Sequence, residues 1–337
     1  MSDTDHPAGD DAPGGLAAPD AGHQGWLDRL DAHAMEHGFH ARLGARHGAL
    51  YTEEDEDVLL VTFEEAATIR DQGAAPPLPQ GLRIAGREGW SQLCLYSEGA
   101  TWFRDPEVYA FFDDLVDDGY FDLFDKVIFY GAGACGYAAC AYSVAAPGAA
   151  VVAIRPHATL APDRAIWDRR HRAARRLDFS GRYGDAPALL EAADQAALVY
   201  DPFVPEDAMH ATLYGPGPAH FRTPHLGPRT ERELEDMGML GPLIGAAARG
   251  KLDRATFARL YRKRRGHAAY LRHVAVALER ADRPWLEGLW CRAALAHAER
   301  PRLRQGLDRA AAALAAQGRS LPPPLWDEAR ARRGALA

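Results

Sequence analysis

The chain has 337 residues, of which 47% are hydrophobic and 9% aromatic, and a formal net charge of −8. This composition can form a sizeable core and excludes a globally disordered protein. A run of about 18 apolar residues, the length that a transmembrane helix needs, does not occur, and the acidic N-terminal residues argue against a secretory signal. We therefore expect a cytoplasmic protein with one large domain or two smaller ones.

Charge is distributed unevenly along the chain. Residues 229–337 carry 22 basic and 12 acidic side chains, a net charge of +10, which leaves −18 for residues 1–228. Opposite charges of this size suggest two parts that dock on one another. We therefore predict no nucleic-acid partner and no membrane span, and a small-molecule or protein partner that the sequence does not identify.

The N-terminal region is predicted to pass from a disordered tail into a helix. Residues 1–25 are rich in Asp, Gly, Pro and Ala, which is typical of disordered segments. Apolar residues from Trp26 to Met35 recur at helical spacing, which predicts an amphipathic helix extending to about Gly48.

From residue 58 onward, strands alternate with helices. The helices are expected from Pro106, over 137–146 and over a basic segment at 169–176. Apolar runs predict strands at 58–63, 92–96, 126–130, 150–154, 196–200 and 220–222. Such strands, separated by helices, indicate a parallel sheet covered on both faces. The sequence thus predicts an α/β core at 26–228, with its N-terminal helix, and a helical C-terminal region at 229–337.

A glycine-rich turn follows the strand at 126–130. Gly131, Gly133 and Gly136 form a G-x-G-x-x-G pattern at the carboxyl end of a strand, where open α/β sheets bind ligands. Glycine there permits close approach of a phosphate to a helix N-terminus. The acidic residue that would hold a ribose is absent, and Arg155 is placed to receive the 2′-phosphate of NADP. One alternative is therefore a nucleotide-dependent oxidoreductase.

The same turn and its flanking strands resemble a second class of protein. The stretch Phe129-Tyr130-Gly131 to Ala139, followed by Val151 to Leu160, is similar to α/β-hydrolase-like proteins associated with surface polysaccharide. The resemblance covers roughly residues 126–240. It implies an α/β-hydrolase-like sheet in which the glycine turn corresponds to a nucleophile elbow, G-x-S-x-G.

The resemblance assigns three catalytic positions, and two of them lack the required side chain. Tyr200-Asp201-Pro202 matches the strand end that carries the acid, which makes Asp201 the acid. Gly133 stands where the serine is expected, and Pro228 stands where the histidine is expected. Glycine has no group that attacks and proline cannot accept a proton, so a Ser-His-Asp mechanism is not expected.

Cys135 and His225 are candidate substitutes for the missing groups. Cys135 lies near a helix N-terminus, which favours the thiolate, and His225 lies three residues before Pro228. A Cys135–His225–Asp201 catalytic unit is therefore one hypothesis. The other is that Cys135 packs beneath the helix as a small hydrophobic residue, the commoner role of a free cysteine.

Proteins with this pattern also go under the name phosphoadenosine phosphosulfate reductase, which would imply an adenosine phosphosulfate ligand. That family has a nucleotide loop with Ser and Asp and a redox cysteine in a Glu-Cys-Gly-Leu-His segment. Neither feature occurs here, since Cys291 lies within Leu289-Trp290-Cys291-Arg292. The four cysteines show no C-x-x-C spacing, and we predict no metal site.

These observations predict an α/β-hydrolase-like parallel sheet with a helical C-terminal extension. The favoured function is a non-catalytic binding or accessory protein that needs no cofactor and, through the resemblance, has a link to surface polysaccharide. A ligand is expected above Gly131–Gly136, near Asp201 and His225. The alternative remains a nucleotide-dependent oxidoreductase in which Gly131, Gly133, Gly136 and Arg155 bind NADP or an adenosine phosphosulfate.

Overall fold

A computed structural model describes residues 21–54, 57–71, 77–297 and 299–323 of the chain. Its contacts divide the chain into two compact units. The first unit runs to Thr223 and also contains Leu240–Phe257, whereas Pro224–Met239 and the residues from Ala258 onward form the second. The chain is thus divided differently from the predicted single boundary after residue 228, because a later segment returns to the first unit.

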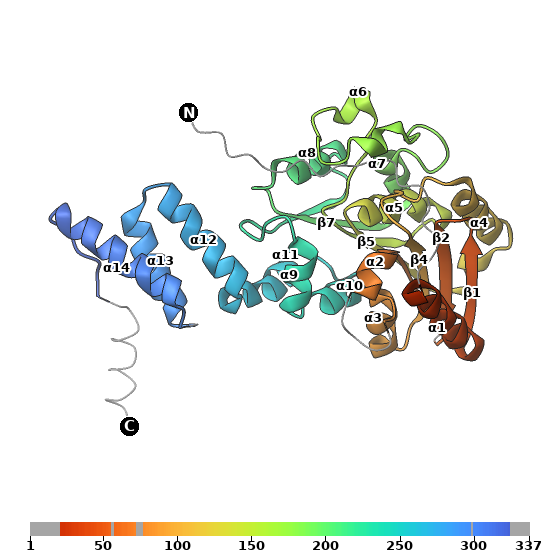
Figure 1. The fold of residues 1–337 in the computed structure, drawn as a ribbon, viewed down its shortest axis with the longest axis horizontal. Coiled ribbons are helices and arrows are strands. Elements are labelled where there is room, and N and C mark those ends of the chain that lie inside the picture. Colours follow the sequence, from red (N-terminus) through yellow and green to blue (C-terminus); the bar gives the residue numbers. More distant parts are fainter. Residues whose placement is uncertain (1–20, 55–56, 72–76, 298, 324–337) are drawn as a thin grey trace. The chain divides into compact units, whose positions relative to one another are not determined.

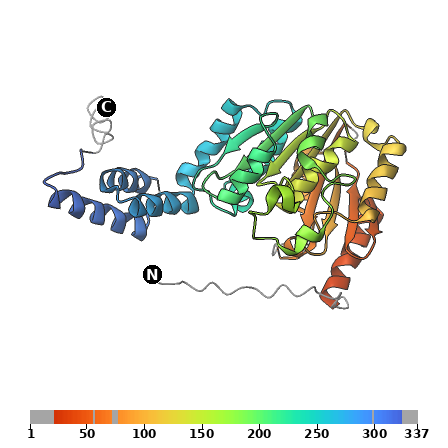
Figure 2. The same ribbon diagram turned by 90° about the horizontal axis from the view of Figure 1, so that it is seen from above.

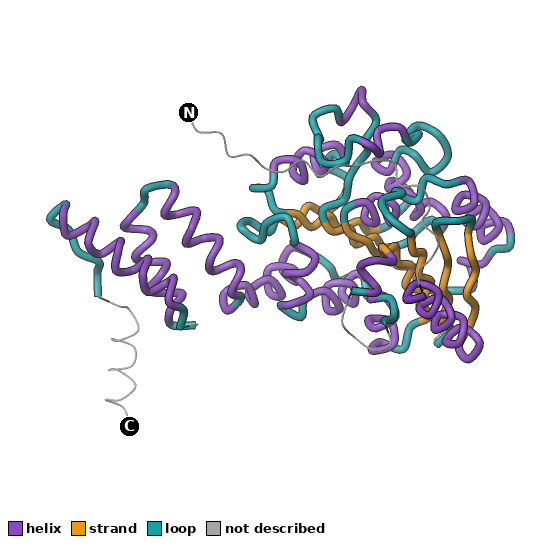
Figure 3. Tube along the Cα trace, viewed as in Figure 1, coloured by secondary structure: helices purple, strands orange, loops and turns teal. Residues whose placement is uncertain are grey.

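Eight strands of the first unit form one sheet, in the order β1-β2-β4-β3-β5-β6-β7-β8. The strands are drawn in orange in Figure 3. The strand β2 is antiparallel to both of its neighbours, and every other adjacent pair is parallel. The bounds are β1 (Gly38–Leu43), β2 (His47–Thr52), β3 (Val58–Glu65), β4 (Ser91–Ser97), β5 (Lys126–Ala132), β6 (Ala150–Ile154), β7 (Gln195–Tyr200) and β8 (Ala219–Arg222). All six predicted strands are present, and this sheet confirms the predicted fold class.

Helices cover both faces of this sheet (Figures 1 and 2). On one face lie α4 (Pro106–Asp117) and α5 (Ala134–Tyr142), and on the other lie α1 (Ala21–His37), α2 (Ala66–Arg70), α3 (Gln80–Glu88) and α10 (Leu240–Ala248). Side chains of a strand point alternately to the two faces. In β3, Leu59, Val61 and Phe63 therefore pack in the core beneath α4 and α5. The central strands β5 and β6 are mostly apolar because both faces of the sheet are buried there.

The N-terminal helix differs from its prediction at both ends. It begins at Ala21, so residues 21–25 are helical, while residues 1–20 of the predicted tail lie outside the described residues. It ends at His37, and the hairpin of β1 and β2 replaces the predicted helix as far as Gly48.

Two glycines permit close packing of β2 against its two neighbouring strands. A Cβ atom on Gly38 would lie 2.3 Å from the carbonyl oxygen of Tyr51, and a Cβ on Gly48 would lie 2.3 Å from the ring of Tyr96. Only glycine permits these close approaches between neighbouring strands.

A cap segment, residues 155–194, connects β6 to β7. Its short helices are α6 (Pro162–Ala165), η3 (Ala173–Arg176), α7 (Ala186–Leu189) and η4 (Leu190–Ala192). The predicted helix over 169–176 is wrong, because only its second half forms a single 3-10 turn. The Asp168 carboxylate accepts a hydrogen bond from the Arg170 amide at 2.9 Å, which holds the chain in a turn.

The remaining elements of the described residues are helices. Those after residue 229 agree with the helical C-terminal region that the sequence predicts. They are η1 (Tyr120–Leu123), η2 (Ser143–Ala145), α8 (Pro205–Leu213), α9 (Thr230–Asp236), α11 (Arg254–Leu260), η5 (Tyr261–Gly266), α12 (Ala268–Arg280), α13 (Pro284–Leu295) and α14 (Pro301–Ala316). Within the described ranges, no helix has the length and apolar character needed to cross a bilayer.

Candidate functional site

The glycine turn is a sharp elbow centred on one residue. Gly133 lies between β5 and α5 with φ 58° and ψ −118°, a conformation that strains any residue with a side chain. Its amide donates to the carbonyl of Ile154 at 2.9 Å, and its carbonyl accepts from the amide of Tyr137 at 3.0 Å. The chain therefore passes from strand to helix through a sharp turn whose apex, Gly133, has no side chain.

Packing requires glycine at Gly131 and leaves little room for a side chain at Gly136. A Cβ atom on Gly131 would lie 2.3 Å from the carbonyl oxygen of Cys135. A Cβ on Gly136 would lie 3.1 Å from the carbonyl oxygen of Gly131 and 3.2 Å from the Cα of Pro156. Close approach of the strand, the helix and the following loop accounts for both glycines without a nucleotide.

Arg155 lies beside the apex of the elbow. It follows β6 with φ 48°, and its Nη2 atom would be 3.6 Å from a Cβ placed on Gly133. Its Nη1 atom is 3.6 Å from the Oδ2 atom of Asp207, which belongs to α8. Two buried atoms here, Nε of Arg155 and Oδ2 of Asp207, have no hydrogen-bond partner among the described residues. One buried donor and one buried acceptor near the glycine turn are thus left without a hydrogen-bond partner among the described residues.

The predicted catalytic residues are divided between the two units. Asp201 directly follows β7, is 1% exposed and accepts a hydrogen bond from the amide of Phe203 at 2.9 Å. Cys135 lies in the first turn of α5 and is buried in the core, which favours its packing role. His225 follows β8 but belongs to the second unit, where its carbonyl accepts a hydrogen bond from His273 at 3.0 Å. The first unit by itself thus contains Asp201 and Cys135 of the hypothetical catalytic unit.

A buried polar cluster was missed by the sequence reasoning. His157, Asp168 and His210 each offer a ligand-type atom, and these atoms lie within 4.8 Å of one another. The Nε2 atom of His210 lies 3.0 Å from Oδ2 of Asp168. The residues come from two places in the cap and from α8, so no local spacing could have indicated them.

Hydrogen bonds to the outer ring nitrogens determine what this cluster can bind. The amide of Ala158 donates to Nδ1 of His210 at 3.1 Å, and the indole of Trp102 donates to Nδ1 of His157 at 3.2 Å. Both donors are obligatory, so each neutral ring carries its proton on Nε2. A metal on Nε2 would move that proton to Nδ1, where it would face another N–H group. The geometry therefore fits a hydrogen-bonded network better than a metal site.

This network extends toward the elbow. Burial alone would raise the pKa of Asp168, but hydrogen bonds from His210 and Arg170 outweigh it and hold the pKa well below its usual range. Arg170 also donates to Oδ1 of Asp207 at 2.7 Å. Burial and the neighbouring His210 and His171 lower the pKa of His157 well below its usual value, so this ring is neutral at pH 7.

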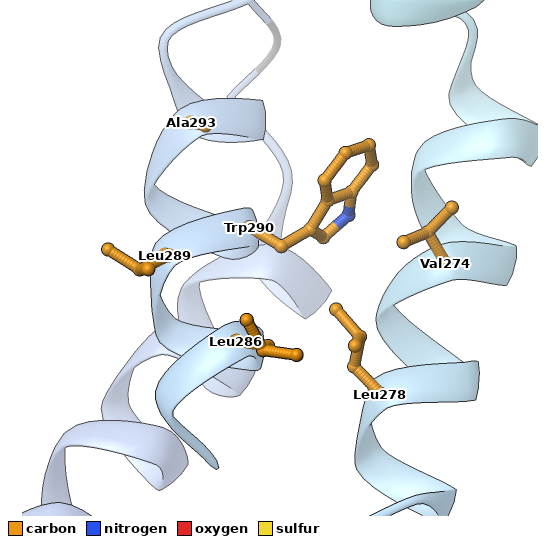
Figure 4. A pocket seen from close by; sticks show the side chains of 6 residues that line it. All are labelled: Val274, Leu278, Leu286, Leu289, Trp290 and Ala293. Atoms are coloured by element: carbon orange, nitrogen blue, oxygen red, sulfur yellow. The ribbon is translucent and has the colours of Figure 1, made fainter. Parts of the chain in front are cut away.

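The second unit contains an apolar groove between α12 and α13 (Figure 4). Its volume is about 400 Å³, and its lining residues are Val274, Leu278, Leu286, Leu289, Trp290 and Ala293. The Trp290 indole is the polar group of this lining, and it donates to the carbonyl of Leu271 at 3.4 Å. The groove offers apolar contact but no group that could perform acid–base or nucleophilic chemistry.

No protein-family model and no curated protein matches the chain. Among solved structures, an esterase of Pyrobaculum calidifontis is 16% identical over 71% of this chain and 96% of that one, with a TM-score of 0.41. The capsule O-acetyltransferase of Neisseria meningitidis serogroup A is 10% identical over 58% and 91%, with a TM-score of 0.36. Carboxyl esterase 2 of Tuber melanosporum is 15% identical over 60% and 82%, with a TM-score of 0.37. Similarity at this level carries no argument about activity.

Proposed function

We propose that this chain is a non-catalytic binding or accessory protein on an α/β-hydrolase-like sheet. Gly133 is the observation that carries the proposal, because its backbone keeps the elbow conformation while its apex has no nucleophile. The Arg155 guanidinium lies 3.6 Å from the Cβ position, in the space that a serine side chain would enter. Asp201 alone cannot perform Ser-His-Asp chemistry, which needs all three groups.

The proposed ligand lies beside Gly133, against Arg155 and Asp207. A buried polar atom without a partner costs about 1–3 kcal/mol. Nε of Arg155 and Oδ2 of Asp207 are two such atoms, and Oδ2 lies 3.6 Å from Nη1 of the same arginine. A ligand that supplies their missing hydrogen bonds would recover this cost. The link to surface polysaccharide is supported by the sequence resemblance alone.

A nucleotide-dependent oxidoreductase using NADP or an adenosine phosphosulfate is the second candidate. The position of Arg155 beside the glycine turn favours it. Two observations weigh against it. Packing requires Gly131 and leaves little room for a side chain at Gly136, and the Gly133 amide is already bonded to the carbonyl of Ile154. A phosphate cradle needs backbone amides that face the ligand.

Two assays on the full chain test this proposal. We expect the wild type not to hydrolyse p-nitrophenyl acetate, and we expect Gly133→Ser to gain no activity, because Pro228 stands at the position of the base. We also expect no rise in melting temperature with NADPH, NADH or adenosine 5′-phosphosulfate. Wild-type hydrolysis that Asp201→Asn abolishes would overturn the proposal. A nucleotide-induced rise that Arg155→Gln removes would favour the oxidoreductase.

A further inference from the structure

We propose that the apolar groove between α12 and α13 binds an amphipathic helix of another protein, one whose polar face is acidic. The groove lies within the second unit, so this inference goes beyond the function proposed above and does not depend on a ligand beside Gly133. Three observations carry it: the exposure of the groove, the packing of α14, and the excess of positive charge on these helices.

The groove is lined by apolar side chains that solvent can reach. Leu286 is 46% exposed, and Leu278, Leu289 and Trp290 are only partly buried. Leu286 and Trp290 of α13 point toward Leu278 and Val274 of α12 (Figure 4). Single exposed apolar residues are normal on a protein surface, whereas a contiguous group of them is typical of an interaction site.

The packing of α14 indicates which shape of partner fits the groove. This helix contacts both α12 and α13. It lies against the face of α13 that carries Glu287 and Cys291, since Sγ of Cys291 would be 2.9 Å from a Cβ placed on Gly306 of α14. Leu286 and Leu289 occupy a different face of α13 and line the groove. A further helix in the groove would therefore complete a four-helix bundle, with its apolar stripe between α12 and α13.

The charges of these helices favour an acidic partner. Residues 258–323 carry 14 basic and 5 acidic side chains. Three of the acidic side chains already form ion pairs: Glu279 and Glu287 with Arg309, and Glu299 with Arg304. Most of the positive charge of this region is therefore left to interact with a partner of opposite charge.

Two arginines bring part of this charge to one end of the groove. Arg280 is the last residue of α12, two residues after Leu278, and Arg283 directly precedes α13, three residues before Leu286. Both are exposed, and Asp282 between them offsets only one of their charges. A second copy of the chain would bring the same excess of positive charge, so an acidic helix is the better complement.

The first experiment measures peptide binding to the full chain by fluorescence anisotropy. The probe is a fluorescein-labelled peptide of about 14 residues, roughly four helical turns, with leucine on one face and glutamate on the other. One control peptide has lysine in place of glutamate, and another has the same leucines and glutamates in an order that forms no apolar stripe. We expect only the probe to bind. Because the whole chain has a net charge of −8, non-specific attraction would instead favour the lysine peptide.

Substitution of Leu286 tests the apolar contact. Leu286→Glu is expected to weaken binding of the glutamate probe about tenfold, because it places a negative charge in the groove. Its side chain is 46% exposed, so the fold should accept the change, which circular dichroism checks. Leu123→Glu, at a leucine of the first unit that is 68% exposed, is the matched control and should bind like the wild type. Leu286→Met keeps the apolar contact and should also bind like the wild type.

Substitution of the two arginines tests the charge. Arg280→Gln combined with Arg283→Gln is expected to weaken binding of the glutamate probe about threefold and to make it less dependent on salt. Arg87→Gln, at an exposed arginine of α3 in the first unit, is the matched control. If Leu286→Glu does not fold, this pair of variants decides the question.

Several results would overturn the inference. These are binding of neither charged peptide, equal binding of the glutamate and lysine peptides, or binding of the probe that the groove variants leave unchanged. Sedimentation velocity supplies a further test, because a wild-type dimer that Leu286→Glu dissociates would show that a second copy occupies the groove. Binding to vesicles of phosphatidylserine and phosphatidylcholine that Leu286→Glu abolishes would assign the groove to a lipid surface. None of these outcomes affects the ligand proposed beside Gly133.

Discussion

At the scale of single residues, the glycines of the turn show that one sequence motif is compatible with different structural roles. The spacing of Gly131, Gly133 and Gly136 suggested a phosphate cradle, and the structure gives two of them a steric reason. Asp201 could be placed at the end of β7 from the sequence, because an apolar strand followed by Asp-Pro has a clear end. The Arg155–Asp207 pair could not, because its partners are 52 residues apart and meet only in the folded chain.

Gly131→Ala should be strongly destabilising. The added Cβ would lie 2.3 Å from a backbone oxygen of α5, which cannot move without shifting the helix. We expect a loss of about 3 kcal/mol in the free energy of unfolding, measured by urea denaturation. The control is Gly86→Ala in α3, where nothing lies within 4 Å of the added Cβ and a gain of about 0.5–1 kcal/mol is expected. Equal effects of the two substitutions would contradict the steric role of Gly131.

His47 should make folding stability depend on pH. Burial lowers the pKa of this histidine to about 4, against the opposing effect of Asp105. The unfolded chain, with a histidine pKa of about 6.5, therefore binds more protons than the folded chain between these values. The contribution of the neutral His47 to the free energy of unfolding is fully present above pH 6.5. It falls by up to about 1.4 kcal/mol per pH unit as the pH decreases toward 4. His157 and His171 act in the same direction.

The measurement is urea unfolding of wild type and His47→Gln at several pH values from 4.5 to 7.5. We expect the free energy of unfolding to depend less steeply on pH in the variant, by up to about 1.4 kcal/mol per pH unit, which is the contribution of one proton. An identical slope in both proteins would show that His47 is not the group responsible.

At the scale of elements, the strands were predictable and the cap was not. The strands β3, β5 and β6 are continuous apolar runs because helices cover both faces of the sheet. The edge strand β1 has the mixed sequence Gly-Phe-His-Ala-Arg-Leu and gives no such signal. The cap has only short helices, and part of it is held by hydrogen bonds from Arg104 to backbone carbonyls, which any residue can provide, so its path leaves little pattern in the sequence.

Arg104 links the segment before α4 to residues 178–183 of the cap. Its Nε atom donates to the carbonyl of Asp178 at 2.8 Å, and its Nη1 atom donates to the carbonyls of Arg182 and Tyr183. We expect Arg104→Met to leave the sheet intact and to speed amide hydrogen exchange across residues 178–184 at least tenfold. The same measurement on Arg164→Met, which removes a partly exposed ion pair, is the control. Unchanged exchange in Arg104→Met would show that other contacts hold this segment.

At the scale of the whole molecule, the division of the chain into two units follows its tertiary contacts and differs from the boundary suggested by the distribution of charge along the sequence. The net charges of −18 and +10 placed a boundary near residue 228, whereas the apolar helix α10 belongs to the first unit beyond that point. Leu240, Leu243 and Ile244 of α10 are buried, and the helix contacts β5 and β6. The docking of the two oppositely charged parts stays a prediction, which small-angle scattering at low and high salt would test.

Two truncated chains test the role of α10. A chain that ends at Phe257 keeps α10, and we expect it to retain cooperative thermal unfolding of the first unit. A chain that ends at Pro228 lacks α10 and exposes the apolar face of β5 and β6, so we expect it to bind the dye ANS and to aggregate. Circular dichroism and ANS fluorescence measure both effects. Cooperative unfolding of the shorter chain would show that α10 is dispensable.

The return of the chain to its own sheet also has a consequence for synthesis. The chain passes out of the first unit after Thr223, and this unit is complete only when Leu240–Phe257 has been synthesised. At a ribosomal speed of roughly 5–20 residues per second, the face of β5 and β6 stays uncovered for several seconds after those strands have emerged. During that interval the nascent chain presents apolar surface that a chaperone can bind. The second unit includes the residues from Ala258 onward, so it can be completed only after Leu240–Phe257 has been synthesised.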